Sequence, residues 1–322
     1  MTKRALVTGG AGFVGQWMAR AMLALGWEVY SAGVGSPTGA VLTPAERGAV
    51  RWLEMDVRSR AQVIAALDAA RPDAIVHLAG ISYLPSAADA PAEAWAVNVV
   101  GAVTLLSEVA RRLRAGALDP RILVAGSAQQ YGRHDPGELP LSENAEQRPL
   151  TVYAASKAAQ EIAAMQAFRA DGVQAIATRS FNHSGVGHDA HFLLPALVRR
   201  ALALREGADS ERVIQIGNGD AIRDYLHVAD VVDAYLALLD RGIPGEAYNV
   251  CSGEGVRVRT LTEQVLEHAG VVAEISSDPA LQRSVDVPAL VGSPEKLARA
   301  TGWRPRRTRD DIIDDLLHAA TH

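Results

Sequence analysis

The sequence predicts an α/β fold in which a doubly wound parallel sheet carries a smaller, discontinuous C-terminal lobe. Short β-branched apolar runs alternate with longer alanine- and leucine-rich segments through the first half of the chain. A glycine-rich turn lies between the first of these runs and the first long segment. Beyond Arg179 the pattern loosens into helices, short strands and turn residues. Regular alternation of strands and helices is typical of a parallel sheet covered by helices on both faces.

Two different spacings of apolar residues predict the elements of the first half. Short β-branched runs predict strands at Ala5–Val7, Glu28–Tyr30, Val50–Leu53, Ala74–Leu78, Arg121–Val124 and Val173–Thr178. Apolar residues three and four positions apart predict helices at Val14–Leu25, Arg60–Ala70, Ala92–Arg114 and Val152–Ala170. Pro72 ends the second of these helices, because proline lacks the backbone N–H that a continuing helix needs.

The second half predicts a smaller lobe that is interrupted by a return to the main sheet. Helices are expected at Leu193–Arg205, Ala229–Leu239 and Leu261–Ala269, and the strand Glu246–Val250 is expected to rejoin the main sheet. We therefore expect a dinucleotide-binding domain made of residues 1–180 and about 225–250. A substrate-binding lobe would contain residues 181–224 and 251–322.

Composition narrows the partners and the location. A net charge of −5 provides no basic field, which argues against nucleic acid as a partner. The single cysteine, Cys251, excludes an internal disulfide and a thiolate metal cluster, so we expect no metal site and a cytoplasmic protein. The apolar run after Met1–Arg4 stops at Gly9, too early for an export signal. No apolar stretch approaches membrane-spanning length on inspection of the sequence, so we expect no membrane partner.

The first strand is followed by a turn with the spacing of a phosphate-binding loop. Gly9, Gly12 and Gly15 satisfy G-x-x-G-x-x-G, and Gly10 gives the alternative G-x-G-x-x-G. Glycines at such places allow a tight turn, close approach to a pyrophosphate and close packing of helix on strand. The helix that begins at Val14 would then point its amides at the phosphates, and Phe13 and Val14 would contact the cofactor. The turn therefore predicts a dinucleotide cofactor in a Rossmann sheet.

Further cofactor contacts are expected where strands end at the same edge of the sheet. Asp56 and Val57 follow the third strand, where the Asp56 carboxylate can accept a hydrogen bond from an adenine amino group, or else cap the helix that starts near Ser59. Asn98 interrupts an apolar helical face, either as a cofactor contact or as a buried amide that bridges helix and sheet. The fourth strand closes beside the cofactor with Leu78, Ala79 and Gly80.

Three residues form a candidate catalytic group. Tyr153 and Lys157 are four apart near the start of a helix and so share one face. A phenol has a reference pKa of about 10, which a nearby ammonium would lower, making the phenol a proton shuttle for a carbonyl or alcohol. Ser127 ends the fifth strand, at the edge where open α/β sheets bind ligands, and could hold the substrate oxygen.

Taken together, these motifs resemble those of one enzyme family. The run Thr8-Gly9-x-x-Gly12-x-x-Gly15, with Asp56, Leu78-Ala79-Gly80, Ser127 and Tyr153-x-x-x-Lys157, resembles the extended short-chain dehydrogenase/reductases, the NAD-dependent epimerase/dehydratase group. The resemblance implies that Ser127 and Tyr153 contact the reacting oxygen and that Lys157 also hydrogen-bonds the nicotinamide ribose. It further implies a homodimer formed through Ala92–Arg114 and Val152–Ala170.

The second half narrows this resemblance. The segment Arg179-Ser180-Phe181-Asn182-His183-Ser184-Gly185-Val186-Gly187 resembles the R-P-F-N-H-x-G-P-G stretch of GDP-6-deoxymannose reductases and their relatives, although two prolines are missing. The likeness continues through 216–225 and 248–253 and implies a nucleotide-sugar substrate. Asn182 would contact its diphosphate. His183 is either a ligand contact or a histidine satisfied within the lobe.

Two arginines are candidates for the diphosphate itself. Arg223 would ion-pair with the phosphates, since its planar fork matches phosphate oxygens. The alternative is a local ion pair with Asp224 or Asp220. Arg283 would be a second phosphate contact, although Arg283-Ser284-Val285-Asp286 departs from the usual R-P-x-D of the group.

The residue at position 129 helps to distinguish the candidate reactions. Related dehydratases carry an acid two residues before the tyrosine of a T-x-E-x-Y-G segment, and Gln129 holds that place here, beside the substrate. Since an amide is neither an acid nor a base at ordinary pH, dehydration is disfavoured. The first choice is reduction of a 4-keto-6-deoxy nucleotide sugar, with a GDP sugar favoured, and an epimerase of a nucleotide sugar is the alternative. A non-catalytic NADP-binding sensor is a further, less favoured class.

The residues after the second strand give little indication of whether the cofactor is NAD or NADP. Ser31-Ala32-Gly33-Val34-Gly35 follows the second strand with neither an acid for a ribose hydroxyl nor an arginine for a 2′-phosphate. The absence of a repelling carboxylate gives NADP a slight edge over NAD.

Overall fold

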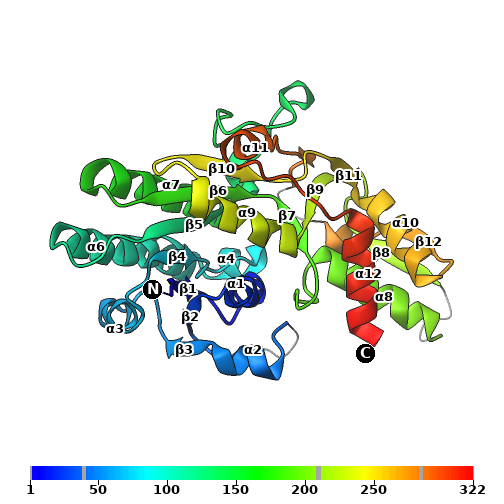
Figure 1. Cartoon of the computed structure of the whole chain (residues 1–322). Coiled ribbons are helices and arrows are strands. Elements are labelled where there is room, and N and C mark those ends of the chain that lie inside the picture. The colour runs from blue at the N-terminus through cyan, green and yellow to red at the C-terminus, as the bar shows by residue number, and fades with distance from the viewer. Residues whose placement is uncertain (1, 38–40, 208–211, 283–285, 322) are drawn as a thin grey trace.

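The computed structural model describes residues 2–37, 41–207, 212–282 and 286–321, and a seven-stranded parallel sheet forms its centre (Figure 1). Across the sheet the strands lie in the order β10 (Ala247–Val250), β6 (Ala175–Ser180), β5 (Arg121–Ser127), β4 (Ala74–His77), β1 (Arg4–Thr8), β2 (Glu28–Gly33) and β3 (Arg51–Glu54). All neighbouring pairs are parallel. The chain starts at β1, moves outward to β3 and then crosses back to β4. The predicted doubly wound fold is thus confirmed, with its switch point between β1 and β4.

Helices cover both faces of this sheet, and each face has its own core. Helices α3 (Arg60–Ala70), α6 (Gly101–Arg114) and α7 (Val152–Asp171) pack on one face, where Leu6 and Ile75 point. Helices α1 (Phe13–Ala24), α9 (Val228–Arg241) and α11 (Glu295–Thr301) pack on the other, where Val7 and Val76 point. Alternate residues of one strand therefore enter opposite cores, which explains why the strands are apolar throughout rather than alternating. A short helix, α2 (Pro44–Ala49), precedes β3.

The long helix expected at Ala92–Arg114 is present but interrupted. It begins as α5 (Pro91–Trp95), passes through a π-helical turn at Ala96–Val100 and continues as α6, after the short α4 (Leu84–Asp89). By length and composition, residues 91–114 could cross a membrane, contrary to our expectation that no stretch approached that property. One side of this stretch nevertheless packs into the core over the sheet, through Leu105, Leu106 and Val109.

The lobe lies beyond the carboxyl ends of the main strands, on the right of Figure 1. A small sheet contains β11 (Gly255–Arg257), β9 (Ile222–His227), β13 (Ala289–Leu290) and β7 (Asn182–Ser184), and β8 (Val213–Ile216) pairs with β12 (Glu274–Ser277). Helices α8 (Leu193–Arg205), α10 (Val258–Ala269) and α12 (Arg309–Thr321) share a separate core. The predicted return of Glu246–Val250 to the main sheet is confirmed, since β10 pairs with β6. The predicted domain bounds remain a proposal.

Candidate active site

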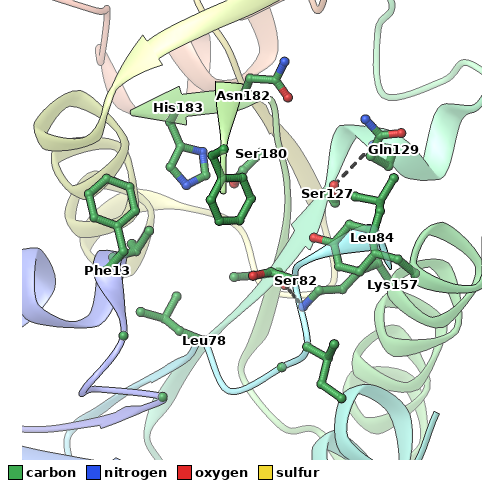
Figure 2. A pocket seen from close by; sticks show the side chains of 18 of the residues that line it. Phe13, Leu78, Ser82, Leu84, Ser127, Gln129, Lys157, Ser180, Asn182 and His183 are labelled. Atoms are coloured by element: carbon green, nitrogen blue, oxygen red, sulfur yellow. Dashed lines mark hydrogen bonds between the residues drawn. The ribbon is translucent and has the colours of Figure 1, made fainter. Parts of the chain in front are cut away.

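A cavity of about 700 Å³ lies between the carboxyl ends of the main strands and the lobe. Its volume is in the range of small-molecule and cofactor sites. The glycine turn lines one end and Arg223 lies on the lobe side, while Ser127, Tyr153 and Lys157 line the part between. Figure 2 shows Phe13 and Leu78 on one side of this cavity, and Ser127, Gln129 and Lys157 on the other. The topology thus places every motif of the first half at the edge of the sheet where ligands bind.

The glycine turn has a shape that only glycine permits at two of its positions. Gly9 has a φ of 67°, and a Cβ there would lie 2.8 Å from the Ala79 nitrogen. A Cβ at Gly15 would lie 2.5 Å from the Gly9 oxygen. Gly12 precedes α1, whose N-terminus has no side-chain cap and no acidic residue in its first turn. Its free amides and dipole fit a pyrophosphate, so this cradle suits a dinucleotide.

Asp56, one of the expected cofactor contacts, already has a partner within the chain. The Asp56 carboxylate accepts hydrogen bonds from the Arg58 backbone and guanidinium, and the pKa of Asp56 is lowered by these bonds. The helix cap near this point is Ser59 rather than Asp56. Asp56 still lines the cavity, together with Val57 and Arg58. An adenine amino group would therefore share this carboxylate with Arg58.

Asn98 is a buried amide that bridges helix and sheet, one of the two alternatives predicted for it. From the π-helical turn, its side chain binds both the N–H and the C=O of Ile81, at 2.8 and 3.2 Å, and it donates to the Ser156 hydroxyl at 2.9 Å. It is not among the residues that line the cavity. Asn98 therefore ties the loop after β4 to α7, close to Tyr153 and Lys157.

The three candidate catalytic residues all line the cavity. The Lys157 ammonium donates to the Ala125 carbonyl and to the Gln160 side chain, both at 2.8 Å. A Cβ on Gly80 would lie 2.9 Å from the Asn98 side-chain oxygen, so the glycine leaves room for this amide beside Lys157. Tyr153 is buried on the same helix, and it hydrogen-bonds with Ser127.

Burial sets the protonation of this group. It raises the pKa of Tyr153, against a smaller opposite effect of the hydrogen bond with Ser127. Our expectation that the ammonium would lower this pKa is thus not met, because burial outweighs the other influences on the phenol. Burial also lowers the pKa of Lys157 to about 8. At neutral pH the site therefore contains a protonated phenol, a hydroxyl and an ammonium.

The lobe residues lie in the cavity, but their partners differ from those predicted. Asn182 and His183 are on β7, and the His183 ring lies 2.8 Å from the Phe181 carbonyl, with its pKa lowered by burial. Arg223 is buried and forms an ion pair with Asp286, donating to it at 2.6 Å, whereas the sequence suggests Asp224 or Asp220 as the local partner. Arg283 falls outside the described residues.

Other cavity residues were missed by the sequence analysis. His188 stacks between Phe13 and Phe192, with ring centroids 4.5 and 4.2 Å away, and burial lowers the pKa of His188 to about 3. His188 and Phe192 are four residues apart, but Phe13 is distant in sequence, so no local pattern reveals the whole stack. Ser180, which stands where the family motif has proline, hydrogen-bonds Tyr235 at 2.7 Å, and both line the cavity. The missing proline was the available signal for this second hydroxyl pair.

This fold and this site together define an extended short-chain dehydrogenase/reductase, a nicotinamide-dependent oxidoreductase. The chain belongs to the family whose model is described as GDP-mannose 4,6 dehydratase, which matches residues 6–316. Membership of a family fixes the fold and the site plan rather than the reaction, since one fold supports several related chemistries.

The similar proteins have several activities. GDP-6-deoxy-D-mannose reductase of Pseudomonas aeruginosa is 33% identical, and the match covers 98% of this chain and 97% of that protein. The structure of RMD from Pseudomonas aeruginosa complexed with NADPH has a TM-score of 0.81 and 30% identity, over 98% of each chain. UDP-glucose 4-epimerase of Thermus thermophilus, complexed with NAD, has a TM-score of 0.85 and 28% identity, also over 98% of each chain.

Proposed function

We propose that the protein uses NADPH or NADH to reduce the 4-keto group of a 6-deoxyhexose on a nucleoside diphosphate, with a GDP sugar favoured. Gln129 is the observation that carries the choice of reaction. It lines the cavity, and its backbone N–H donates to the Ser127 hydroxyl at 3.2 Å (Figure 2). Its amide stands where the related dehydratases carry an acid. Because an amide cannot transfer protons at ordinary pH, elimination of water lacks a proton-transfer group there.

The protonated phenol supports reduction in particular. The nicotinamide supplies the hydride when it is bound, and Ser127 and Tyr153 would contact the reacting oxygen. Burial keeps the Tyr153 phenol protonated by raising its pKa, so Tyr153 can donate a proton to that oxygen at once. An epimerase must first accept a proton from an alcohol, which a raised pKa disfavours. Lys157 would hold the nicotinamide ribose through its ammonium.

The cofactor would lie along the glycine turn and the ends of the strands. We propose that its contacts are Gly9, Gly12, Phe13, Val14, Gly15, Asp56, Val57, Leu78, Ala79, Gly80, Tyr153 and Lys157, with Asn98 acting through the loop after β4. Gly33 and Val34 also line the cavity, and no carboxylate stands there to repel a 2′-phosphate. This gives NADP a slight edge over NAD. The lone, buried Cys251 fits a cytoplasmic location.

The alternative is a nucleotide-sugar epimerase, which the similarity to the Thermus thermophilus enzyme favours. A cofactor balance separates the two. On a 4-keto-6-deoxy nucleotide sugar, we expect one equivalent of NADPH or NADH to be oxidised for each product molecule formed. The loss of absorbance of the reduced cofactor measures this oxidation. Redox-neutral conversion of a 4-hydroxy nucleotide sugar would instead identify an epimerase. Release of water from the parent hexose nucleotide would identify a 4,6-dehydratase, and binding of NADP without turnover would identify a sensor.

Arg223 is proposed to bind the substrate diphosphate. Replacing it with alanine should weaken binding of GDP by about 1.5–3 kcal/mol, roughly 10–150-fold, because a charge-assisted contact in a buried site is lost. Calorimetry with GDP measures this, and NADPH affinity should not change. Arg200→Ala is the matched control, since Arg200 is a half-buried lobe arginine that donates to the Gln215 carbonyl and does not line the cavity. Equal GDP affinity for Arg223→Ala and the unaltered protein would show that Arg223 serves only Asp286.

We also propose a homodimer through α6 and α7. The stretch from the π-helical turn into α6 exposes Val100 and Val103, and α7, which packs beside α6, exposes 67% of Ile162. Ile162→Glu should convert a dimer to a monomer in light scattering, because a charge would be buried at the interface. Val272→Glu makes the same change at an exposed apolar residue outside these helices and should leave the dimer intact. A monomeric unaltered protein would refute the proposal.

A further inference from the structure

Ser127 is held by the tight turn that follows it. Its hydroxyl oxygen accepts from the Gln129 N–H at 3.2 Å, and its own N–H donates to the Gln130 side-chain oxygen at 2.8 Å. These two bonds fix the backbone and the side-chain direction of Ser127 together. Because the oxygen already accepts from the Gln129 N–H, the hydroxyl hydrogen is left to be donated on the cavity side, where it meets the Tyr153 oxygen and could turn to a substrate oxygen.

Gln130 is itself held from behind by a buried ion pair. Its side-chain nitrogen donates to the Glu161 carboxylate at 2.8 Å. The Arg179 guanidinium donates two hydrogen bonds to the same carboxylate, at 2.7 and 2.9 Å. Gln130 is fully buried, and Glu161 and Arg179 are each 6% exposed. These hydrogen bonds therefore connect Ser127 at the end of β5 to Glu161 on α7 and Arg179 on β6. Gln130, Glu161 and Arg179 do not line the cavity.

The burial of an ion pair is not in itself a source of stability. A buried ion pair loses its hydration, and well-packed apolar side chains often do as well or better in its place. The ion pair instead fixes the orientation of the Gln130 side-chain amide. The Gln130 amide can satisfy both neighbours in only one way, with its nitrogen toward the Glu161 carboxylate and its oxygen toward the Ser127 N–H. The charge on Glu161 therefore determines which end of the amide faces Ser127.

We propose that Gln130, Glu161 and Arg179 are positioning residues that set the geometry of Ser127 at the reacting oxygen. The proposal rests on the proposed function, because the role of Ser127 belongs to that function. The group touches neither substrate nor cofactor and acts on the rate through Ser127. Disturbing it should therefore lower kcat while leaving cofactor affinity and the KM for the sugar nucleotide nearly unchanged.

Gln130→Glu tests the orientation argument. The introduced carboxyl can accept from the Ser127 N–H, but when ionised it faces the Glu161 carboxylate and cannot donate to it. Burial and the neighbouring negative charge should raise its pKa well above the usual value of about 4.3. We expect kcat to be about 10²-fold below that of the unaltered protein at high pH, as for a small misplacement of a reacting group. It should recover as the pH falls and the carboxyl becomes protonated.

The matched control is Gln147→Glu. Gln147 also donates to the Glu161 carboxylate, at 2.8 Å, and its side-chain oxygen accepts from the Gln130 nitrogen at 3.3 Å, but it does not hydrogen-bond Ser127. A carboxylate in place of this oxygen can still accept from Gln130, so the orientation of the Gln130 amide should be kept. This variant should show no new pH dependence of kcat. If both variants showed the same dependence, the effect would come from charge near Glu161 alone, and the proposal would be overturned. A flat pH profile for a folded Gln130→Glu would overturn it as well.

Two further variants keep the test decisive. Gln130→Met has a similar length and no charge, so it should lose kcat at all pH values without a new pH dependence; unaltered kcat would refute the positioning role even if Gln130→Glu fails to fold. Ser127→Ala separates this inference from the proposed function. If Ser127→Ala keeps full turnover, the proposed function fails. If only Ser127→Ala loses turnover while the Gln130 variants remain normal, the positioning proposal fails alone.

Discussion

Replacing Tyr153 with phenylalanine should lower kcat by about 10²–10⁴-fold, the usual contribution of a general acid. The phenol is buried beside Ser127, and its raised pKa keeps it protonated and ready to donate. Phenylalanine keeps the ring and its packing and removes only the hydroxyl. The affinity for NADPH should therefore stay close to normal. Steady-state kinetics and a fluorescence titration of the reduced cofactor measure the two quantities separately.

Tyr248→Phe is a suitable control for the loss of a buried tyrosine hydroxyl. Tyr248 is 1% exposed and accepts a hydrogen bond from the Ile243 N–H at 3.1 Å, away from the cavity. This variant should lose some thermal stability and little turnover. Near-normal kcat in Tyr153→Phe would show that another group protonates the substrate oxygen, with Ser127 the first to examine.

The sequence was sufficient to predict the sheet because its signals are local. The helix at Arg60–Ala70 has the predicted bounds, since Ser59 caps its start and Arg71, in a left-handed conformation, ends it before Pro72. The π-helical turn around Asn98 could not be predicted, because apolar spacing does not distinguish it from a continuous helix. The helix α12 was also missed, although Ile312, Ile313 and Leu316 are buried at helical spacing.

In the candidate site too, the features that local sequence determines could be predicted, and those that depend on the fold could not. The glycine turn and the pair Tyr153 and Lys157 are short motifs whose spacing alone places them on one turn or one helix face. The bond between Arg223 and Asp286 joins residues 63 positions apart, so only the folded lobe reveals it. The direction of the Tyr153 pKa also depended on burial, which no local pattern reports. Local motifs thus predicted which residues would line the cavity, whereas the electrostatics of the site required the structure.

Lys157→Ala should harm two properties at once, in contrast to Tyr153→Phe. We expect turnover to fall by about 10²-fold or more and the affinity for NADPH to fall with it, because one ammonium is proposed to serve both the acid–base group and the nicotinamide ribose. Burial lowers the pKa of Lys157 to about 8, so in the free protein its charge is present below that pH and is lost above it. Cofactor affinity of the unaltered protein should therefore weaken as the pH rises through about 8.

The same pH dependence distinguishes Lys157 from a merely structural lysine. The alanine variant should bind NADPH weakly at every pH, without the change near pH 8. Lys296→Ala is the matched control, since the Lys296 ammonium also bonds a backbone carbonyl and a side chain, Ala247 and Glu246, but lies outside the cavity. Fluorescence titrations across this pH range measure the effect. If Lys157→Ala bound NADPH as the unaltered protein does, the ammonium would act on the phenol alone and the ribose contact would have to be abandoned.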